Sequence, residues 1–126
     1  HAPHTPLEKS DFLSAPNGVI GMETSFCAAY TALVLTGLMT VSELIYRMST
    51  LPAKILGRDL GTLRVGAPAD LILIDEHETW VVDPEHLHGK SKNAVFKGRK
   101  LQSKIKMTVC NGEIVFEDER EKNYGA

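Results

Sequence analysis

The sequence predicts an α/β chain in which helices occupy the first half and antiparallel strands the second. Two observations lead to this fold class. Between positions 19 and 56, apolar residues recur at three- and four-residue spacing, as in amphipathic helices. After position 68 they form short runs of strand length, separated by turn residues. Helices followed by strands are typical of an α+β domain or of the end of a larger protein that carries a small sheet.

Size and composition restrict the class of protein. The chain has 126 residues, 43% of them apolar, and a formal net charge of −2. A chain of this kind can form a core and is not disordered by composition. The balanced charge excludes a nucleic-acid binder that relies on bulk electrostatics. The most apolar stretch, 27–39, is shorter than the roughly 20 residues that span a bilayer, so we expect no membrane partner.

Residues 1–18 are expected to be irregular. Two prolines lie within the first six positions, and Ala15-Pro16-Asn17-Gly18 is a turn signal. A helix is predicted over 19–36, and Gly37 is a suitable residue to end it. The apolar face predicted for this helix consists of Met22, Phe26, Ala29, Leu33 and Thr36.

A second helix is predicted to start at Thr40, because Thr40 and Glu43 have the spacing of a capping box. Its apolar face is predicted to contain Leu44, Ile45 and Met48. A third short helix is predicted to follow, with Ser49 or Thr50 near its cap, Pro52 in its first turn and Gly57 at its end.

The strands are predicted over 69–75, 79–82, 105–109 and 113–117. Asn111-Gly112 separates the last two and is the preferred dipeptide of a type I′ hairpin. The segment 88–100 is expected to be a basic loop. Cys27 and Cys110 each lie in an apolar pattern, which favours buried free thiols and a cytoplasmic location.

Four motifs could carry chemistry. His1-Ala2-Pro3-His4 could bind a metal or an anionic substrate, or it could be an exposed loop. Backbone amides at 15–18 could bind a carboxylate, or the turn could simply cap the helix. His86-Leu87-His88 has the spacing of a metal site but is better interpreted as an exposed turn. The basic segment 90–100 is interpreted as a solvated loop or as one that docks on an acidic surface.

Taken in order, several segments resemble dihydroorotases of the amidohydrolase superfamily. The N-terminal segments His1-Ala2-Pro3-His4 and 15–24 are similar to the end of their catalytic barrel. Pro52-Ala53-Lys54-Ile55-Leu56-Gly57 and the loop Lys90-Ser91-Lys92-Asn93 resemble later family motifs. The segments 61–71 and 109–115 resemble the return to a small β domain and its closing hairpin, which hydantoinases and allantoinases share.

The resemblance implies the C-terminal end of a metal-dependent hydrolase (β/α)8 TIM barrel plus part of a small β-sandwich. Residues 1–57 would be the last barrel loop and the C-terminal helices, and residues 58–126 the β-sandwich appendix with the C-terminal tail. The implied reaction interconverts N-carbamoyl-aspartate and dihydroorotate in de novo pyrimidine biosynthesis. In that reaction a zinc-bound hydroxide attacks the ring amide.

The resemblance also assigns site residues. His4 matches the histidine that binds the substrate carboxylate, and the backbone at Asn17 and Gly18 matches the other substrate contact. The family's catalytic aspartate would immediately precede His1, so we expect no catalytic residue and no metal ligand in this chain. Zinc is expected only in the complete enzyme, and the chain alone is expected to be inactive.

The implied partners are the remaining N-terminal part of the same enzyme, a small-molecule substrate and a second copy in a homo-oligomer. Two alternatives remain open from the sequence. One is a cyclic amidase of the hydantoinase or allantoinase type. The other is a dihydroorotase-like structural partner without catalytic activity.

Overall fold

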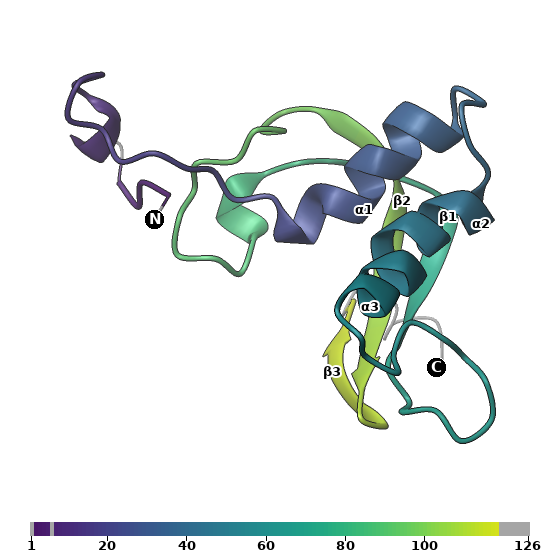
Figure 1. Cartoon of the computed structure of the whole chain (residues 1–126). Helices are drawn as coiled ribbons and strands as arrows, with labels where there is room; N and C mark the ends of the chain where they lie inside the picture. Colours follow the sequence, from purple (N-terminus) through teal and green to yellow (C-terminus); the bar gives the residue numbers. More distant parts are fainter. Residues whose placement is uncertain (1, 6, 119–126) are drawn as a thin grey trace, which may run out of the picture.

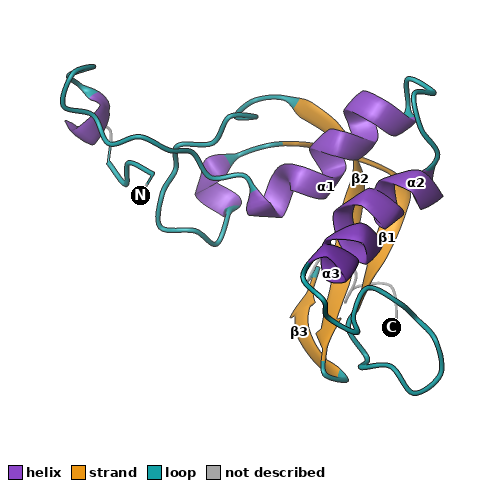
Figure 2. Cartoon of the chain, in the orientation of Figure 1, coloured by secondary structure: helices purple, strands orange, loops and turns teal. Residues whose placement is uncertain are grey.

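The computed structural model of the chain describes residues 2–5 and 7–118. Helices precede an antiparallel sheet, as predicted, and they form two helical segments before three strands (Figures 1 and 2). The first segment joins the 3₁₀ turn η2 (Met22–Thr24), α1 (Ser25–Ala29) and the π-helical turn η3 (Tyr30–Val34). The second joins α2 (Val41–Ile45), the π-helical turn η4 (Tyr46–Thr50) and α3 (Leu51–Ile55). Two further 3₁₀ turns are η1 (Leu7–Lys9) and η5 (Pro84–His86).

The first helical segment ends as predicted at Gly37. This glycine has a φ of +74°, and its N–H donates to the carbonyl of Val34 at 2.9 Å. The N–H of Leu38 donates to the carbonyl of Leu33 at 3.0 Å. A glycine adopts this left-handed conformation without steric cost, which explains the stop.

The buried face of the first segment differs from the prediction. Thr24, Cys27 and Tyr30 are buried, whereas Met22 of the predicted face is 93% exposed. The polar residues on this face are compatible with burial because each has a partner. The Tyr30 hydroxyl donates to Glu76 Oε2 at 3.1 Å, and Thr31 Oγ1 accepts from the N–H of Gln102 at 2.9 Å. Sequence periodicity alone could not show that these hydroxyls turn toward the sheet.

The capping box predicted at Thr40 is confirmed. The N–H of Glu43 donates to Thr40 Oγ1 at 3.2 Å, and the N–H of Thr40 donates to Glu43 Oε2 at 2.7 Å. The third predicted helix is α3, with Thr50 before it and Pro52 in its first turn, but it continues directly from η4 instead of starting anew. The N–H of Leu51 donates to the carbonyl of Tyr46, five residues back, so the wider π turn accommodates Pro52 without a break.

We expect Thr40→Ala to loosen the start of the second helical segment, because the side-chain acceptor for the Glu43 N–H is lost. A cap of this kind contributes about 1 kcal/mol, which corresponds to about fivefold faster amide hydrogen exchange at Glu43. Thr36→Ala is the matched control, since Thr36 Oγ1 bonds a carbonyl within its own helix rather than capping an N–H. Equal exchange at Glu43 in both variants would contradict the capping role.

The sheet has the strand order β1-β2-β3, with all neighbours antiparallel. Its strands are β1 (Leu71–Val81), β2 (Lys100–Cys110) and β3 (Glu113–Glu117). The hairpin predicted at Asn111-Gly112 is confirmed, because these residues have φ angles of +50° and +82°. The strands predicted over 69–75 and 79–82 form one strand. The register shifts between Asp75 and Thr79, where a bulge faces Ser103 of β2.

The core lies between the first helical segment and the sheet. Its fully buried members are Cys27, Val82 and Leu101, and α1 contacts β2 directly. Burial raises the pKa of the Cys27 thiol, so this cysteine behaves as a small apolar side chain. The prediction of burial is wrong for Cys110, which is exposed at the end of β2 beside the hairpin turn. Within the described residues, the helices are too short or too polar to cross a bilayer.

Candidate functional site

His4 lies at the start of a small hydrogen-bonded loop. Its backbone N–H donates to Glu8 Oε2 at 3.0 Å, and the N–H of Glu8 donates to Thr5 Oγ1 at 3.3 Å. The first bond joins the Glu8 side chain to the His4 backbone and the second joins the Glu8 backbone to the Thr5 side chain, and together they organise the turn that leads into η1. The His4 side chain is exposed, so its imidazole is accessible to a ligand. His1, the other histidine of the motif, lies outside the described residues.

The Asn17–Gly18 turn is the second candidate, and both residues are exposed. Gly18 has a φ of +114°, a conformation that a side chain would strain. Its carbonyl accepts a hydrogen bond from Asn93 Nδ2 at 2.8 Å. Among residues 2–5 and 7–118, no hydrogen bond engages the backbone N–H of Asn17 or of Gly18. These two donors are therefore available to an anionic or carbonyl ligand.

The chain passes directly from this turn into a parallel bridge between Ile20 and Ala94. The N–H of Ile20 donates to the carbonyl of Asn93 at 3.0 Å. Two bonds from Asn93, one by its side chain and one by its backbone, therefore hold residues 18–20 in place.

The segment that carries His4 is held by residues next to Asn93. The hydroxyl of Ser91 donates to the carbonyl of Pro3, the residue before His4. Ser91 is 4% exposed, and its oxygen also accepts from the N–H of Asn93 at 3.1 Å. The sequence motifs at 1–4 and 15–18 are thus brought onto one support, the segment Ser91–Asn93.

The support belongs to the 84–99 loop, which connects β1 to β2 and starts with η5 (Figure 1). A further contact anchors this loop on the first helical segment. His88 Nδ1 lies 2.8 Å from Glu23 Oε2, and the N–H of His88 donates to Glu23 Oε1 at 3.1 Å. Partial burial raises the pKa of Glu23, but its hydrogen bonds from His88 and the Gly89 backbone outweigh this effect and lower it.

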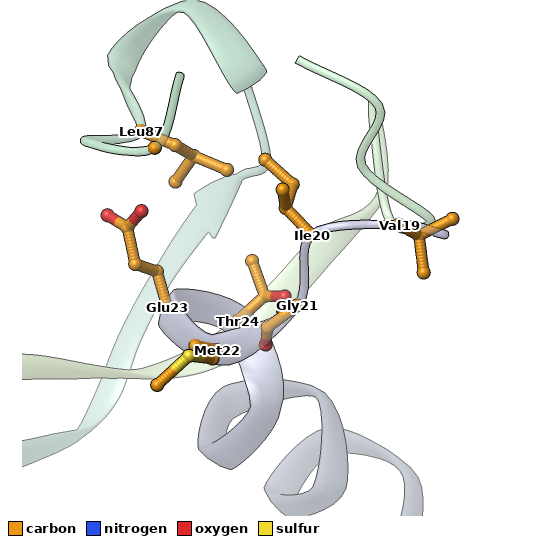
Figure 3. A pocket seen from close by; sticks show the side chains of 8 residues that line it. Val19, Ile20, Gly21, Met22, Glu23, Thr24 and Leu87 are labelled. Carbon is orange, nitrogen blue, oxygen red and sulfur yellow. Dashed lines mark hydrogen bonds between the residues drawn. The ribbon is translucent and has the colours of Figure 1, made fainter. Parts of the chain in front are cut away.

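A cavity of about 270 Å³ lies between the 84–99 loop and the start of the first helical segment. Figure 3 shows Leu87 of the loop above Glu23 and Thr24 of the helix. The lining of the cavity is mostly apolar, and the carboxylate of Glu23 is already bonded to His88. The residues expected to bind substrate, His4, Asn17 and Gly18, do not line this cavity.

The other histidine motif forms an exposed turn, as interpreted from the sequence. His86 Nδ1 lies 3.0 Å from Asp83 Oδ2, whereas His88 bonds Glu23. Over residues 2–5 and 7–118, no group of three or more His, Cys, Asp or Glu side chains could hold a metal ion. The described residues therefore do not fit a zinc centre by themselves.

The interpretation of 90–100 as a solvated loop is wrong for its first half. Ser91 is buried, and Lys92 Nζ donates to the carbonyl of Leu87 at 3.0 Å. In the sequence, Lys90-Ser91-Lys92-Asn93 stands out as a basic run and a family motif, and neither property assigns a role to Ser91 or Asn93. The uncharged residues inside a basic run were the available signal, because they are suited to internal hydrogen bonds.

The arrangement can bind a ligand at two points. An exposed imidazole can donate a hydrogen bond to a carboxylate, and two open backbone N–H groups can bind another oxygen. The first point is held by the buried Ser91 and the second by Asn93, two residues further along the same loop.

Comparison with known proteins gives consistent matches. Residues 10–115 match the family model described as "Amidohydrolase family". The chain is 44% identical over 120 residues to a dihydroorotase of Syntrophus aciditrophicus (strain SB), covering 94% of this chain and 28% of that protein. It is 41% identical over 117 residues to a dihydroorotase of Clostridioides difficile (strain 630), covering 92% of this chain and 27% of that protein. The chain thus spans about 28% of the first of these relatives.

Solved structures match as well. The L-hydantoinase (dihydropyrimidinase) from Arthrobacter aurescens gives a TM-score of 0.78 at 32% identity, covering 85% of this chain and 24% of that one. The D-hydantoinase (dihydropyrimidinase) from Thermus sp. gives a TM-score of 0.79 at 25% identity, covering 87% of this chain and 24% of that one. These matches confirm the expected fold class, a segment of a (β/α)8 hydrolase with part of its small β domain.

Proposed function

The chain belongs to the amidohydrolase family, and from this premise we propose that it is the C-terminal part of a dihydroorotase. The proposed reaction interconverts N-carbamoyl-aspartate and dihydroorotate in pyrimidine biosynthesis. The main support is the identity of 44% over 94% of this chain with a protein named dihydroorotase. The matched hydantoinase structures are less similar in sequence, at 32% for the enzyme from Arthrobacter aurescens.

In this function the chain supplies substrate-binding loops. His4 would donate a hydrogen bond from its imidazole to the substrate carboxylate. The backbone N–H groups of Asn17 and Gly18 would bind a second oxygen of the substrate. The exposure of all three residues and their common support on Ser91–Asn93 favour these roles.

The metal of the proposed reaction would be held elsewhere in the complete protein. The described residues lack a suitable group of ligands, so we propose that zinc is bound by side chains beyond this chain. When bound, zinc supplies a hydroxide nucleophile near neutral pH and polarises the scissile carbonyl. The part of this chain is to bind and orient the substrate.

The remaining part of the same enzyme is the partner that the surface favours. Several large apolar side chains are almost fully exposed, and isolated proteins seldom expose so many. Their exposed fractions are 92% for Phe12, 92% for Leu13 and 93% for Met22. We propose that residues 1–57 complete a catalytic barrel and that residues 58–126 contribute to a small β domain. We also propose a cytoplasmic homo-oligomer.

The test is the substrate preference of the complete protein that contains this chain. We expect ring opening of dihydroorotate and ring closure of N-carbamoyl-aspartate, with bound zinc, and at least about tenfold lower kcat/KM for hydantoin and allantoin. A substrate without the carboxylate would leave the imidazole donor of His4 unpaired, which is the physical reason for the expected preference. Turnover of hydantoin without turnover of dihydroorotate would replace the proposal with a hydantoinase, the class of the matched structure from Arthrobacter aurescens. A metal-free protein without activity on any of these rings would indicate a structural partner.

A further inference from the structure

We propose that Ser91 and Asn93 are positioning residues, which hold the His4 segment and the Asn17–Gly18 turn in a fixed relation so that both meet one substrate. This inference rests on the proposed function. It assigns to the segment Ser91–Asn93 a role in substrate binding although neither side chain is proposed to touch the substrate.

Ser91 acts on the His4 segment. Its hydroxyl donates to the carbonyl of Pro3 and accepts from the N–H of Asn93, so both capacities of the oxygen are used. Ser91 is 4% exposed, and Pro3 is buried beside it. Because Pro3 directly precedes His4, this bond sets where the His4 backbone begins. Loss of the hydroxyl would leave the Pro3 carbonyl without this donor in a buried place.

Asn93 acts on the turn. Its Nδ2 donates to the carbonyl of Gly18 at 2.8 Å, and its own carbonyl accepts from the N–H of Ile20 at 3.0 Å. The two bonds hold the Gly18–Val19 peptide and the N–H of Ile20, and so anchor the chain directly after the N–H groups of Asn17 and Gly18. Among the described residues, the hydrogen bonds of 10–18 stay within 7–18 except for this one from Asn93.

The shape of the chain makes such a support necessary. The segment that carries His4 and η1 extends away from the sheet, and the 84–99 loop runs beside it (Figure 1). His88 and Glu23 anchor the same loop on the first helical segment. Ser91 and Asn93 therefore connect the two exposed loops to the rest of the structure and hold them in position. A substrate that binds both loops needs them in register, because misplacement by about 1 Å can cost about 100-fold in rate.

The experiment uses the complete protein and its kinetics with dihydroorotate. We expect Ser91→Ala and Asn93→Ala each to raise KM about tenfold and to change kcat less, since both loops bind the substrate rather than perform the chemistry. Ser91→Thr keeps the hydroxyl and is expected to restore KM to within about threefold. Lys90→Ala is the matched control, because Lys90 is exposed and adjacent to Ser91. It is expected to leave both constants unchanged.

A double-variant comparison separates positioning from a general structural effect. If Ser91 acts through His4, Ser91→Ala should change KM by less than about twofold once His4 is alanine. Asn93→Ala acts through Gly18, so its tenfold effect should persist in the His4→Ala background. A full Ser91 effect in that background, or no KM effect of either single variant, would overturn the proposal.

Hydrogen exchange of residues 2–20 provides a readout that does not depend on the reaction. Both variants are expected to speed exchange of this segment about tenfold relative to wild type and Lys90→Ala. If the wild type turns over hydantoin instead of dihydroorotate, the proposed function fails, and the same KM comparison is made with hydantoin. Unchanged exchange in both variants would overturn the positioning role whatever the substrate.

Discussion

His4→Ala in the complete protein is expected to lower kcat/KM for dihydroorotate about 10- to 100-fold while leaving the metal content unchanged. Hydrogen bonds to charged groups contribute about 1.5–3 kcal/mol, which corresponds to a loss of this size. The imidazole is exposed, and its loop is held through backbone bonds to Glu8 and Ser91 that alanine retains. Steady-state kinetics in both directions, together with metal analysis of the purified protein, measure the two parts of the expectation.

His77→Ala is the matched control for this variant, because His77 is exposed on β1, outside the proposed site. It is expected to retain wild-type kinetics. Loss of zinc in His4→Ala would show that His4 belongs to the metal centre and would contradict its assignment to the substrate carboxylate. Unchanged kinetics would remove His4 from the site altogether.

Asp118→Asn is expected to destabilise the protein by about 2 kcal/mol at neutral pH. Asp118 is 9% exposed, and its Oδ2 lies 2.7 Å from Lys104 Nζ and 3.4 Å from Lys106 Nζ. Glu78 completes the cluster from β1 and bonds both lysines. Removal of this anion leaves two poorly hydrated ammonium groups with one carboxylate fewer beside them, which is costly in a buried place.

The pH dependence of stability follows from the direction in which folding shifts the pKa of Asp118. Burial raises the pKa of Asp118, but the hydrogen bonds and charges of Lys104 and Lys106 outweigh it and lower the pKa from 3.8 to about 2. Because the folded-state pKa lies below the unfolded value, the stabilisation is complete above about pH 4. It is lost as the pH falls toward 2. A shift of this size corresponds to about 2 kcal/mol.

The measurement is the urea midpoint of unfolding between pH 2 and pH 6. The wild type should lose stability steeply below pH 4, and Asp118→Asn should lose less over the same range because it lacks this group. The pKa of Glu78 is also lowered: burial raises it, and Lys106 and Lys104 outweigh that effect, so part of the dependence remains in the variant. Glu113→Gln, an exposed residue of β3, is the control. A variant with the full wild-type pH dependence would contradict the ion-pair assignment.

The features that could be predicted from the sequence are those whose partners lie within a few residues. The capping box joins Thr40 to Glu43, and the hairpin turn needs only Asn111 and Gly112. Local hydrogen bonds and the left-handed preference of glycine are sufficient to specify both. Of the candidate site, the sequence supplied His4, Asn17 and Gly18 through family motifs, and their assignment to substrate stays a prediction.

The features that sequence reasoning missed have partners far along the chain. The buried stripe at Thr24, Cys27 and Tyr30 was placed on the wrong face of the helix, because the partner of Tyr30 is Glu76. The continuous strand β1 was divided in two, because its bulge is defined by pairing with β2 rather than by its own residues. No periodicity within one segment contains this information.

The sequence by itself determined the family, the order of helices before strands, and the turns that close over short distances. Its residue types and spacing were sufficient because these properties depend on near neighbours and on recognisable motifs. Only the tertiary structure decided that Ser91 and Asn93 support two loops that lie more than seventy positions earlier in the chain. It also decided that Lys104 and Lys106 are held by the carboxylates of Asp118 and Glu78. A hydroxyl, an amide or an ammonium group can bond many partners, and its actual partner is chosen when folding removes water and brings distant segments together.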